Sequence, residues 1–462
     1  MAEKRSPLDE SNSPLKIQFS YALGSFLDDF IITAFSIRVY AFYENEVFLP
    51  NVFLATAFII YGIWNMVNDP LVGYISDRPT RFTKRWGRRF PWFLFTAIPS
   101  ALVFTIIFSP PVGLDWAIFM WLLIFICLFD FLFSFWNTNW LAAFPVKFRS
   151  HFERTRVAGI QTILSQIGLT IGMLVPPLFF TYGNRVSYIW QAIMVTMIGV
   201  IIATLILPGM REKQAPSEIL FKAIDGSHKS TSYFKTLFFA LKQKNFIAYL
   251  IAYLGQTVMQ VVMLASVPYL IKYVLNAEAD TEILVSGALL VGGLVMVPVW
   301  IKVSRKHGNR LGYMFGTGLT AALLLFFLFV QDLTQAMIAA LLLGMSMSAT
   351  WSLLYPTFSD VIDEMVVKMK ARNEGIFYGF RTFFGRLSIV IQALSFSLIH
   401  FVVGFDPEAI SQTVLALWGL RIQMTIVPAI FYLAGFICMW KIYDITPAKA
   451  LLNKAQLTEL GL

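Results

Sequence analysis

The sequence predicts an all-α membrane protein with twelve transmembrane helices in two pseudo-symmetric six-helix halves and both termini in the cytoplasm. Three observations lead to this fold class. Hydrophobic residues make up 57% of the 462 residues and charged residues only 14%, whereas soluble domains carry about 25% charged residues. Twelve apolar stretches are each long enough to cross a bilayer, which takes about 20 residues. Lysine and arginine gather in alternate loops between these stretches.

The twelve expected spans follow one another along the chain. They cover residues 16–42, 51–76, 90–110, 115–146, 156–182, 188–209, 245–273, 282–303, 310–331, 333–362, 374–404 and 414–443. The polar residues 1–14 are not followed by a short apolar core with a small-residue cleavage site. The first span is therefore expected to stay in the membrane and not to be cleaved as a signal peptide.

The loop charges set the orientation of these spans. Loops after the even-numbered spans hold most of the cations, six of them between residues 78 and 89 alone, whereas loops after the odd-numbered spans are nearly free of them. Cations mark cytoplasmic loops, so both ends of the chain are expected inside the cell. Because the net charge of +9 is spread over short loops, membrane lipids are the expected partners and nucleic acid is not.

The connection near residue 210 is the only long one and marks the expected domain boundary. The predicted organisation is an N-terminal half at 1–209, a linker at 210–244, a C-terminal half at 245–446 and a cytoplasmic tail at 447–462. Within the linker, Phe234, Leu237, Phe238 and Leu241 recur at helical spacing, which predicts an amphipathic helix on the inner leaflet.

The two halves share a loop motif. KRWGRR at 84–89 follows the second span, and RKHGNR at 305–310 follows the eighth, an offset of 221 residues. Matched loops in two halves are typical of a parallel repeat. Either these loops lock one state of two rocking halves or they only signal topology. The gating interpretation selects Asp77, Arg78, Gly87, Arg88, Arg89, Gly308, Asp363, Arg372 and Glu374.

Four polar side chains are expected near the middle of the membrane. Helical rise places Asp29, Asp69, Asn137 and Arg386 about 12–20 Å from the cytoplasmic ends of their spans. Ionisable groups at this depth are costly and indicate a functional site. Together they predict a hydrated cavity.

Two sequence blocks in opposite halves resemble one transporter family. Residues 68–91 read NDPLVGYISDRPTRFTKRWGRRFP, and DVIDE at 360–364 precedes RNEGIFY at 372–378. This pattern resembles the glycoside–pentoside–hexuronide cation symporters of the major facilitator superfamily, which include melibiose permeases and have lysophospholipid symporters as relatives. The resemblance covers nearly the whole chain and implies a small-molecule transporter, expected to be a monomer.

The resemblance also implies site roles. Asp29 takes the place of a sugar-binding aspartate, Asn137 that of a second one, and Arg386 that of a lysine near both sites. The asparagine weakens the expectation of a galactoside. The alternative to a cargo-binding role for Asp29 is a structural ion pair with Arg386. Trp351 and Tyr355 are expected either to stack on a sugar ring or to pack between helices.

The coupling positions depart furthest from the family. Sodium users place two carboxylates four residues apart on the second span, and the corresponding residues here are Asn65 and Asp69. A lone buried aspartate can still carry a proton. We therefore expect proton coupling ahead of sodium and no cofactor beyond this ion.

The predicted function is cation-coupled symport of a glycoside or oligosaccharide. The alternatives are a lysophospholipid or amphiphile symporter of the same fold and a non-transporting sensor. Four scattered histidines, and the lack of a phosphate-binding loop or nucleophile elbow in the sequence, argue against an enzyme.

Overall fold

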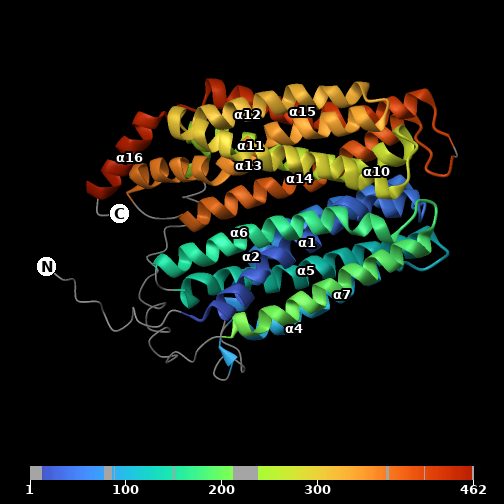
Figure 1. Ribbon diagram of the computed structural model, residues 1–462, viewed down its shortest axis with the longest axis horizontal. Helices are drawn as coiled ribbons and strands as arrows, with labels where there is room; N and C mark the ends of the chain where they lie inside the picture. Colours follow the sequence, from blue (N-terminus) through green and yellow to red (C-terminus); the bar gives the residue numbers. More distant parts are fainter. Residues whose placement is uncertain are drawn as a thin grey trace. The chain divides into compact units, whose positions relative to one another are not determined.

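The structure is a computed structural model that describes residues 13–77, 86–87, 89–148, 151–211, 238–370, 374–409 and 411–459. All regular elements within these ranges are helical (Figure 1). The long helices are α1 (Leu15–Asn45), α2 (Asn51–Asp77), α4 (Phe90–Ile107), α5 (Asp115–Lys147), α6 (His151–Leu174), α7 (Arg185–Met210), α10 (Lys244–Tyr269), α11 (Glu282–His307), α12 (Asn309–Leu324), α13 (Leu333–Met369), α14 (Glu374–Val403) and α15 (Val414–Lys441).

Eleven of the described helices are long and apolar enough to cross a membrane. The twelfth expected span corresponds to α1, which has 31 residues but carries Asp28, Asp29 and Arg38 within its apolar sequence. Helix ends agree with the predicted limits within a few residues at most positions. α6 stops earlier, at Leu174, because the Pro176–Phe179 segment begins with two prolines and forms a 3-10 turn. Proline lacks the amide donor that would continue an α-helix.

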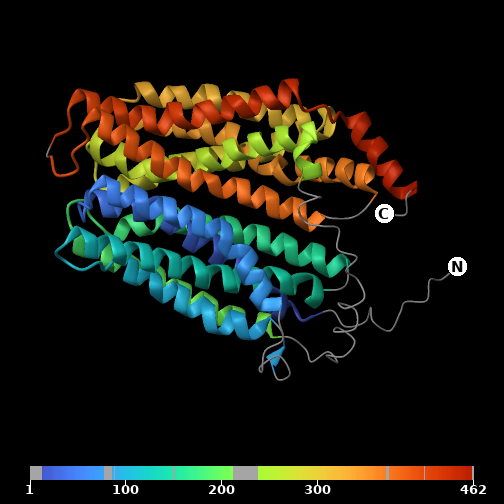
Figure 2. The ribbon, with the colours of Figure 1, turned by 180° about the vertical axis from the view of Figure 1, so that it is seen from behind.

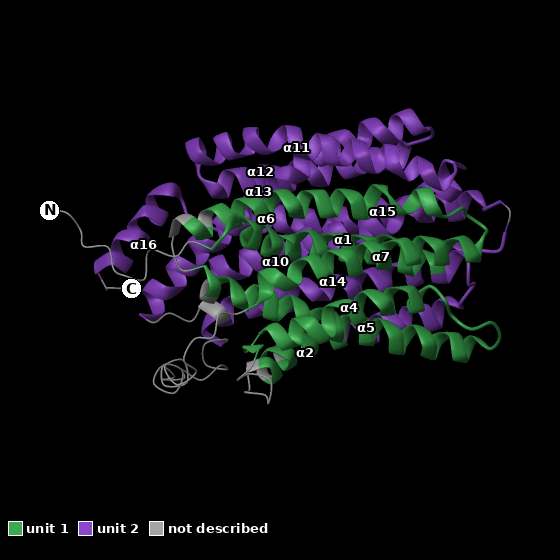
Figure 3. Cartoon of the chain, turned by 60° about the horizontal axis from the view of Figure 1, so that its bottom comes forward, with its two compact units in different colours: residues 1–42, 64–228 green, residues 43–63, 229–462 purple. Residues whose placement is uncertain are grey.

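The chain forms two compact units (Figure 3). The first contains residues 1–42 and 64–228, and the second contains residues 43–63 and 229–462. The division at 228/229 falls inside the predicted linker. The end of α1 and the first half of α2 belong to the second unit, so this unit is not continuous in sequence. The predicted domain limits stay a prediction.

Small residues allow close helix packing in the first unit. α4 packs against α5 and α7 (Figure 1). Gly168 and Gly172 of α6 face α1 so closely that a Cβ atom on Gly172 would lie 2.5 Å from the carbonyl oxygen of Phe30. Small residues four apart let helix backbones approach in a membrane, where apolar side chains gain little from leaving lipid.

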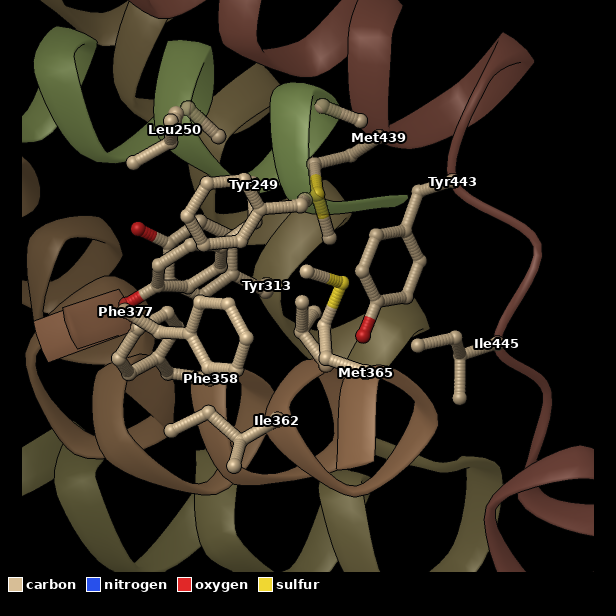
Figure 4. Close-up of a cluster of buried hydrophobic side chains, with 14 of the residues drawn as sticks. Tyr249, Leu250, Tyr313, Phe358, Ile362, Met365, Phe377, Met439, Tyr443 and Ile445 are labelled. Atoms are coloured by element: carbon tan, nitrogen blue, oxygen red, sulfur yellow. The ribbon is translucent and has the colours of Figure 1, made fainter. Parts of the chain in front are cut away.

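The second unit packs α11 against α13 and α10 against α15. At its core lies a cluster of buried side chains that includes Tyr249, Tyr313, Phe358 and Tyr443 (Figure 4). The cluster joins α10, α12 and α13 with the segment after α15. Tyrosine hydroxyls in it find partners, as when Tyr313 donates to Gln256 Oε1 at 2.7 Å. Buried polar atoms need such bonds.

The predicted C-terminal tail contains a further helix, α16 (Pro447–Glu459), beside the end of α13 (Figures 1 and 2). Its Lys449 pairs with Glu364 at 2.8 Å and with Asp444 at 2.5 Å. Asn245 of α10 donates to both carboxylates. Four segments of the second unit are thus tied together at one end. The amphipathic helix predicted at 234–241 lies largely outside the described residues.

Candidate functional site: a buried carboxylate cluster

The first unit contains a buried carboxylate that the sequence analysis overlooked. Asp130 of α5 is 4% exposed, and its two carboxylate oxygens accept hydrogen bonds from the amides of two α2 residues. Asn65 donates to Oδ1, and Asn68 donates to Oδ2 at 2.9 Å. Both asparagines are buried, and within the described residues their own carbonyl oxygens have no hydrogen-bond partner. This leaves a carboxylate and two amide oxygens at one α2–α5 contact.

Asp69 joins the same contact one helical turn away. Its carboxylate accepts a hydrogen bond of 2.7 Å from the Ser134 hydroxyl. Asp69 is four residues after Asn65, and Ser134 is four residues after Asp130, so each pair shares a helix face. Asp69 therefore shares the α2–α5 contact with another carboxylate, that of Asp130, and its role in coupling stays a prediction. The second carboxylate comes from α5, whereas the prediction considered only the spacing within the second span.

Asn137 continues the cluster along α5. Asp130, Ser134 and Asn137 are spaced at i, i+4 and i+7, which places them on one face of the helix within about 11 Å. Asn137 is half-buried. Asn137, which is predicted to contact cargo, thus lies next to the acidic cluster on the same face of α5.

Asp29 is held by α6 of the same unit. Its carboxylate accepts a hydrogen bond of 2.5 Å from the Ser165 hydroxyl. The short approach of α1 and α6 depends on Gly168 and Gly172, three and seven residues after Ser165. Arg386, the predicted partner of Asp29, lies on α14 of the other unit and is half-buried. Their pairing stays a prediction.

The two predicted aromatic residues differ in setting. Trp351 of α13 is half-buried and packs toward Gly293 of α11, where a Cβ atom would lie 3.2 Å from the indole ring. This is an interhelical contact of the kind weighed against sugar stacking. Tyr355, one turn later, is 57% exposed, and its ring lies 5.0 Å from the Arg381 guanidinium carbon.

The two repeated glycines adopt the same backbone region. Gly87 has φ 88° and Gly308 has φ 87°, a region that favours glycine. Gly308 caps α11, because its backbone N–H donates to the carbonyl oxygen of Ser304. Arg89 donates to Ser76 and to Asn139, both at 3.2 Å. Arg89, directly before α4, thereby links the end of α2 to α5.

Other residues of the gating interpretation are less well defined. Asp363 of α13 is half-exposed, while its buried neighbour Glu364 makes the ion pairs to α16. The following lie outside the described residues, either entirely or in their side chains: Asp77, Arg78, Arg88, Arg372 and Glu374.

Comparison with known proteins agrees with a transporter. The family described as MFS/sugar transport protein matches residues 20–447, nearly the entire chain. The chain belongs to this family. As an MFS protein with many apolar helices, it is a multi-pass membrane transporter, and the transporter family implies a small-molecule cargo.

Individual relatives of this MFS protein are distant. Sodium-dependent lysophosphatidylcholine symporter 1 of Xenopus tropicalis is 22% identical over 94% of this chain and 86% of its own length. The human protein of that name is also 22% identical, over 95% and 85%. A crystal structure of a D-xylose-proton symporter covers 93% of this chain and 98% of its own with a TM-score of 0.64. At 14% identity, this likeness shows the fold alone.

The MFS chain has a second buried polar group that the sequence analysis missed. Glu44, near the end of α1, pairs with His400 Nδ1 of α14 at 2.6 Å and accepts a hydrogen bond from Tyr269 of α10. All three residues belong to the second unit. The sequence signals for this pair are a histidine inside an apolar stretch and a glutamate at the end of a span. Buried charges are normally paired, so each predicts a partner.

Proposed function

We propose that this protein is a cation-coupled symporter that carries a glycoside or oligosaccharide by alternating access. The observation that supports it most is the α5 face on which Asp130, Ser134 and Asn137 follow one another. An ion bound at Asp69, to which Ser134 donates, changes the charge and hydrogen bonding on this face next to Asn137. Coupling needs such a link, because an ion affects cargo affinity only through differential interactions in the two states.

Asp69 is the proposed carrier of the coupling ion, and the proton is the first candidate. Each Asp130 oxygen already accepts an amide hydrogen, and Ser134 is the donor to Asp69. Protonation of Asp69 would make it a donor as well as an acceptor. It would also remove one negative charge from the α2–α5 contact that holds Asp130, and like charges disfavour each other's ionised form.

Sodium is the second candidate, because the cluster is rich in oxygen. Asp130 supplies a second carboxylate in place of the one that sodium users carry at the position of Asn65. The buried amide oxygens of Asn65 and Asn68 add neutral ligands. Hard cations prefer carboxylate and carbonyl oxygen. The names of the Xenopus and human relatives also favour sodium for this site.

A lysophospholipid is the second candidate for the cargo. The relatives named lysophosphatidylcholine symporters match nearly the whole chain, whereas the description of the family and the resemblance to melibiose permeases support a sugar. A sensor that binds without transporting is separated from both by uptake into proteoliposomes.

Separate assays of exchange and accumulation test the coupling role. Asp69→Asn and Asp130→Asn should each permit exchange of cargo across liposomes while preventing accumulation against a gradient. Asp115→Asn, at the first residue of α5, is the matched control and should leave both unchanged. Normal accumulation by both cluster variants would refute the coupling role of this site.

A further inference from the structure

A buried guanidinium in the second unit is surrounded by aromatic rings. Arg381 of α14 is only 7% exposed. Its Cζ atom lies 5.0 Å from the ring centroids of Tyr253 and Tyr355, 5.1 Å from that of Phe358 and 5.3 Å from that of Tyr378. These rings come from α10, α13 and α14 and contact the charge from several sides.

Aromatic faces do not satisfy the hydrogen-bonding groups of arginine. Ring quadrupoles attract a cation, but the five N–H donors of a guanidinium need oxygen acceptors. Among the described residues, Arg381 Nε and Nη1 are buried without a hydrogen-bond partner, while Tyr249 is a hydrogen-bond partner of the same guanidinium. Buried charges are normally paired, because an unpaired one is costly. This arginine therefore has unused capacity for an acceptor that is not part of the described chain.

The aromatic cage around Arg381 has buried and exposed members. Tyr249 lies behind two of its rings, stacking on Phe358 with ring centroids 4.8 Å apart and on Tyr253 at 6.2 Å. Figure 4 shows Tyr249 and Phe358 within the buried cluster. Two other rings of the cage are exposed, Tyr355 to 57% and Tyr378 to 37%. A ligand would reach the guanidinium past these two rings.

We propose that Arg381 and its aromatic cage bind an oxyanion of the cargo: a carboxylate, sulfonate or phosphate. The planar guanidinium fork suits bidentate contact with such a group, and the hydroxyls of Tyr253 and Tyr355 add donors. The inference rests on the proposed transport function and narrows the cargo to an anionic glycoside or an anionic lysolipid. Both cargo classes offer the same oxyanion chemistry.

Two matched ligand pairs test the proposal and show whether the oxyanion belongs to a glycoside or to a lysolipid. Octyl glucuronide and octyl glucoside differ in one carboxylate, and oleoyl lysophosphatidate and monooleoylglycerol differ in one phosphate. Binding is measured by tryptophan fluorescence of the full-length protein in neutral phosphatidylcholine nanodiscs. We expect the anionic member of at least one pair to bind about tenfold more tightly or better, since charge-assisted bidentate bonds are strong.

Variants assign this preference to Arg381. Arg381→Gln should reduce the preference to about twofold or less, and Arg381→Lys should retain part of it because the charge stays while the fork is lost. Arg421→Gln is the control, because Arg421 also lies against an aromatic ring, Trp418 at 5.5 Å, but donates to the carbonyl of Val330. Gel filtration verifies folding of each variant.

The outcomes distinguish this inference from the proposed function. Equal affinity for the two members of both pairs, or no binding of any of the four ligands, would overturn the anion site. So would a preference that survives in folded Arg381→Gln. If liposomes accumulate a neutral sugar and Arg381→Gln leaves that uptake unchanged, symport stands and the anion site fails. Selective anion binding without accumulation of any cargo would leave the anion site and refute symport.

Discussion

Gly172→Ala tests whether close packing of α1 and α6 positions Asp29. The added Cβ atom would lie 2.5 Å from the carbonyl oxygen of Phe30, whereas ordinary contacts begin at 3.4 Å. The two helices must therefore separate by about 0.9 Å. A shift of this size lengthens the Ser165–Asp29 hydrogen bond from 2.5 Å to about 3.4 Å, beyond the usual range for hydroxyl donors.

The expected cost follows from two opposing terms. Overpacking costs about 1–3 kcal/mol, and alanine regains about 1 kcal/mol of helix propensity over glycine. Gly172→Ala should therefore lower the free energy of unfolding by up to about 2 kcal/mol. Gly159→Ala on the same helix meets no atom within 4 Å and should instead be neutral or stabilising. Thermal unfolding of the purified protein measures both.

A double-mutant cycle links this packing to the site. Ser165→Ala should cost about 1 kcal/mol in the unmodified protein, a typical value for an interhelical hydrogen bond in a membrane. It should cost almost nothing in the Gly172→Ala background, where the bond is already lost. Equal stability of the two glycine variants, or an unchanged cost of Ser165→Ala, would refute the reasoning.

Three further predictions concern the second unit. Gly308→Ala should destabilise by about 1–3 kcal/mol because φ is 87°, whereas Gly379→Ala, with open space around it, should not; thermal unfolding decides. His400→Leu should lower stability by about 1–3 kcal/mol because it removes a partner of the buried Glu44 carboxylate, and His400→Gln should cost less. Although partial burial opposes the effect, hydrogen bonds from two lysine amines hold the pKa of Asp444 below its ordinary value. The stabilising contribution of Asp444 is therefore complete above about pH 4 and is lost as pH falls. The free energy of unfolding should accordingly change less between pH 7 and pH 3.5 in Asp444→Asn than in the unmodified protein.

The helical architecture was predictable because long apolar stretches have few alternatives in a membrane. α16 was missed because hydropathy does not detect a short polar helix. Its place depends instead on ion pairs of Lys449 with Glu364 and Asp444, which lie far apart in sequence. The glycine repeat was visible in the sequence motif itself, and Gly87 and Gly308 share a positive φ.

The polar site was predictable only in part. Asp69 was identified from its depth in a span, and Asn65 from the resemblance to the symporter family; the structure places both at the α2–α5 contact. Asp130 and Arg381 were missed, although each is a charge inside an apolar stretch and such charges indicate function. Sequence spacing reveals pairs on one helix, whereas these two residues meet their partners across helices.

Uptake under imposed ion gradients tests coupled symport most directly. Cargo is identified first from the anionic and neutral ligand pairs and then supplied to proteoliposomes with an inward proton gradient, an inward sodium gradient or neither. Proton-coupled symport predicts accumulation above the external concentration with the proton gradient, little response to sodium at fixed pH, and loss of the accumulation in Asp69→Asn. Strong stimulation by sodium at fixed pH without proton movement would transfer the coupling role to sodium, and equal uptake under all three conditions would contradict ion-coupled symport.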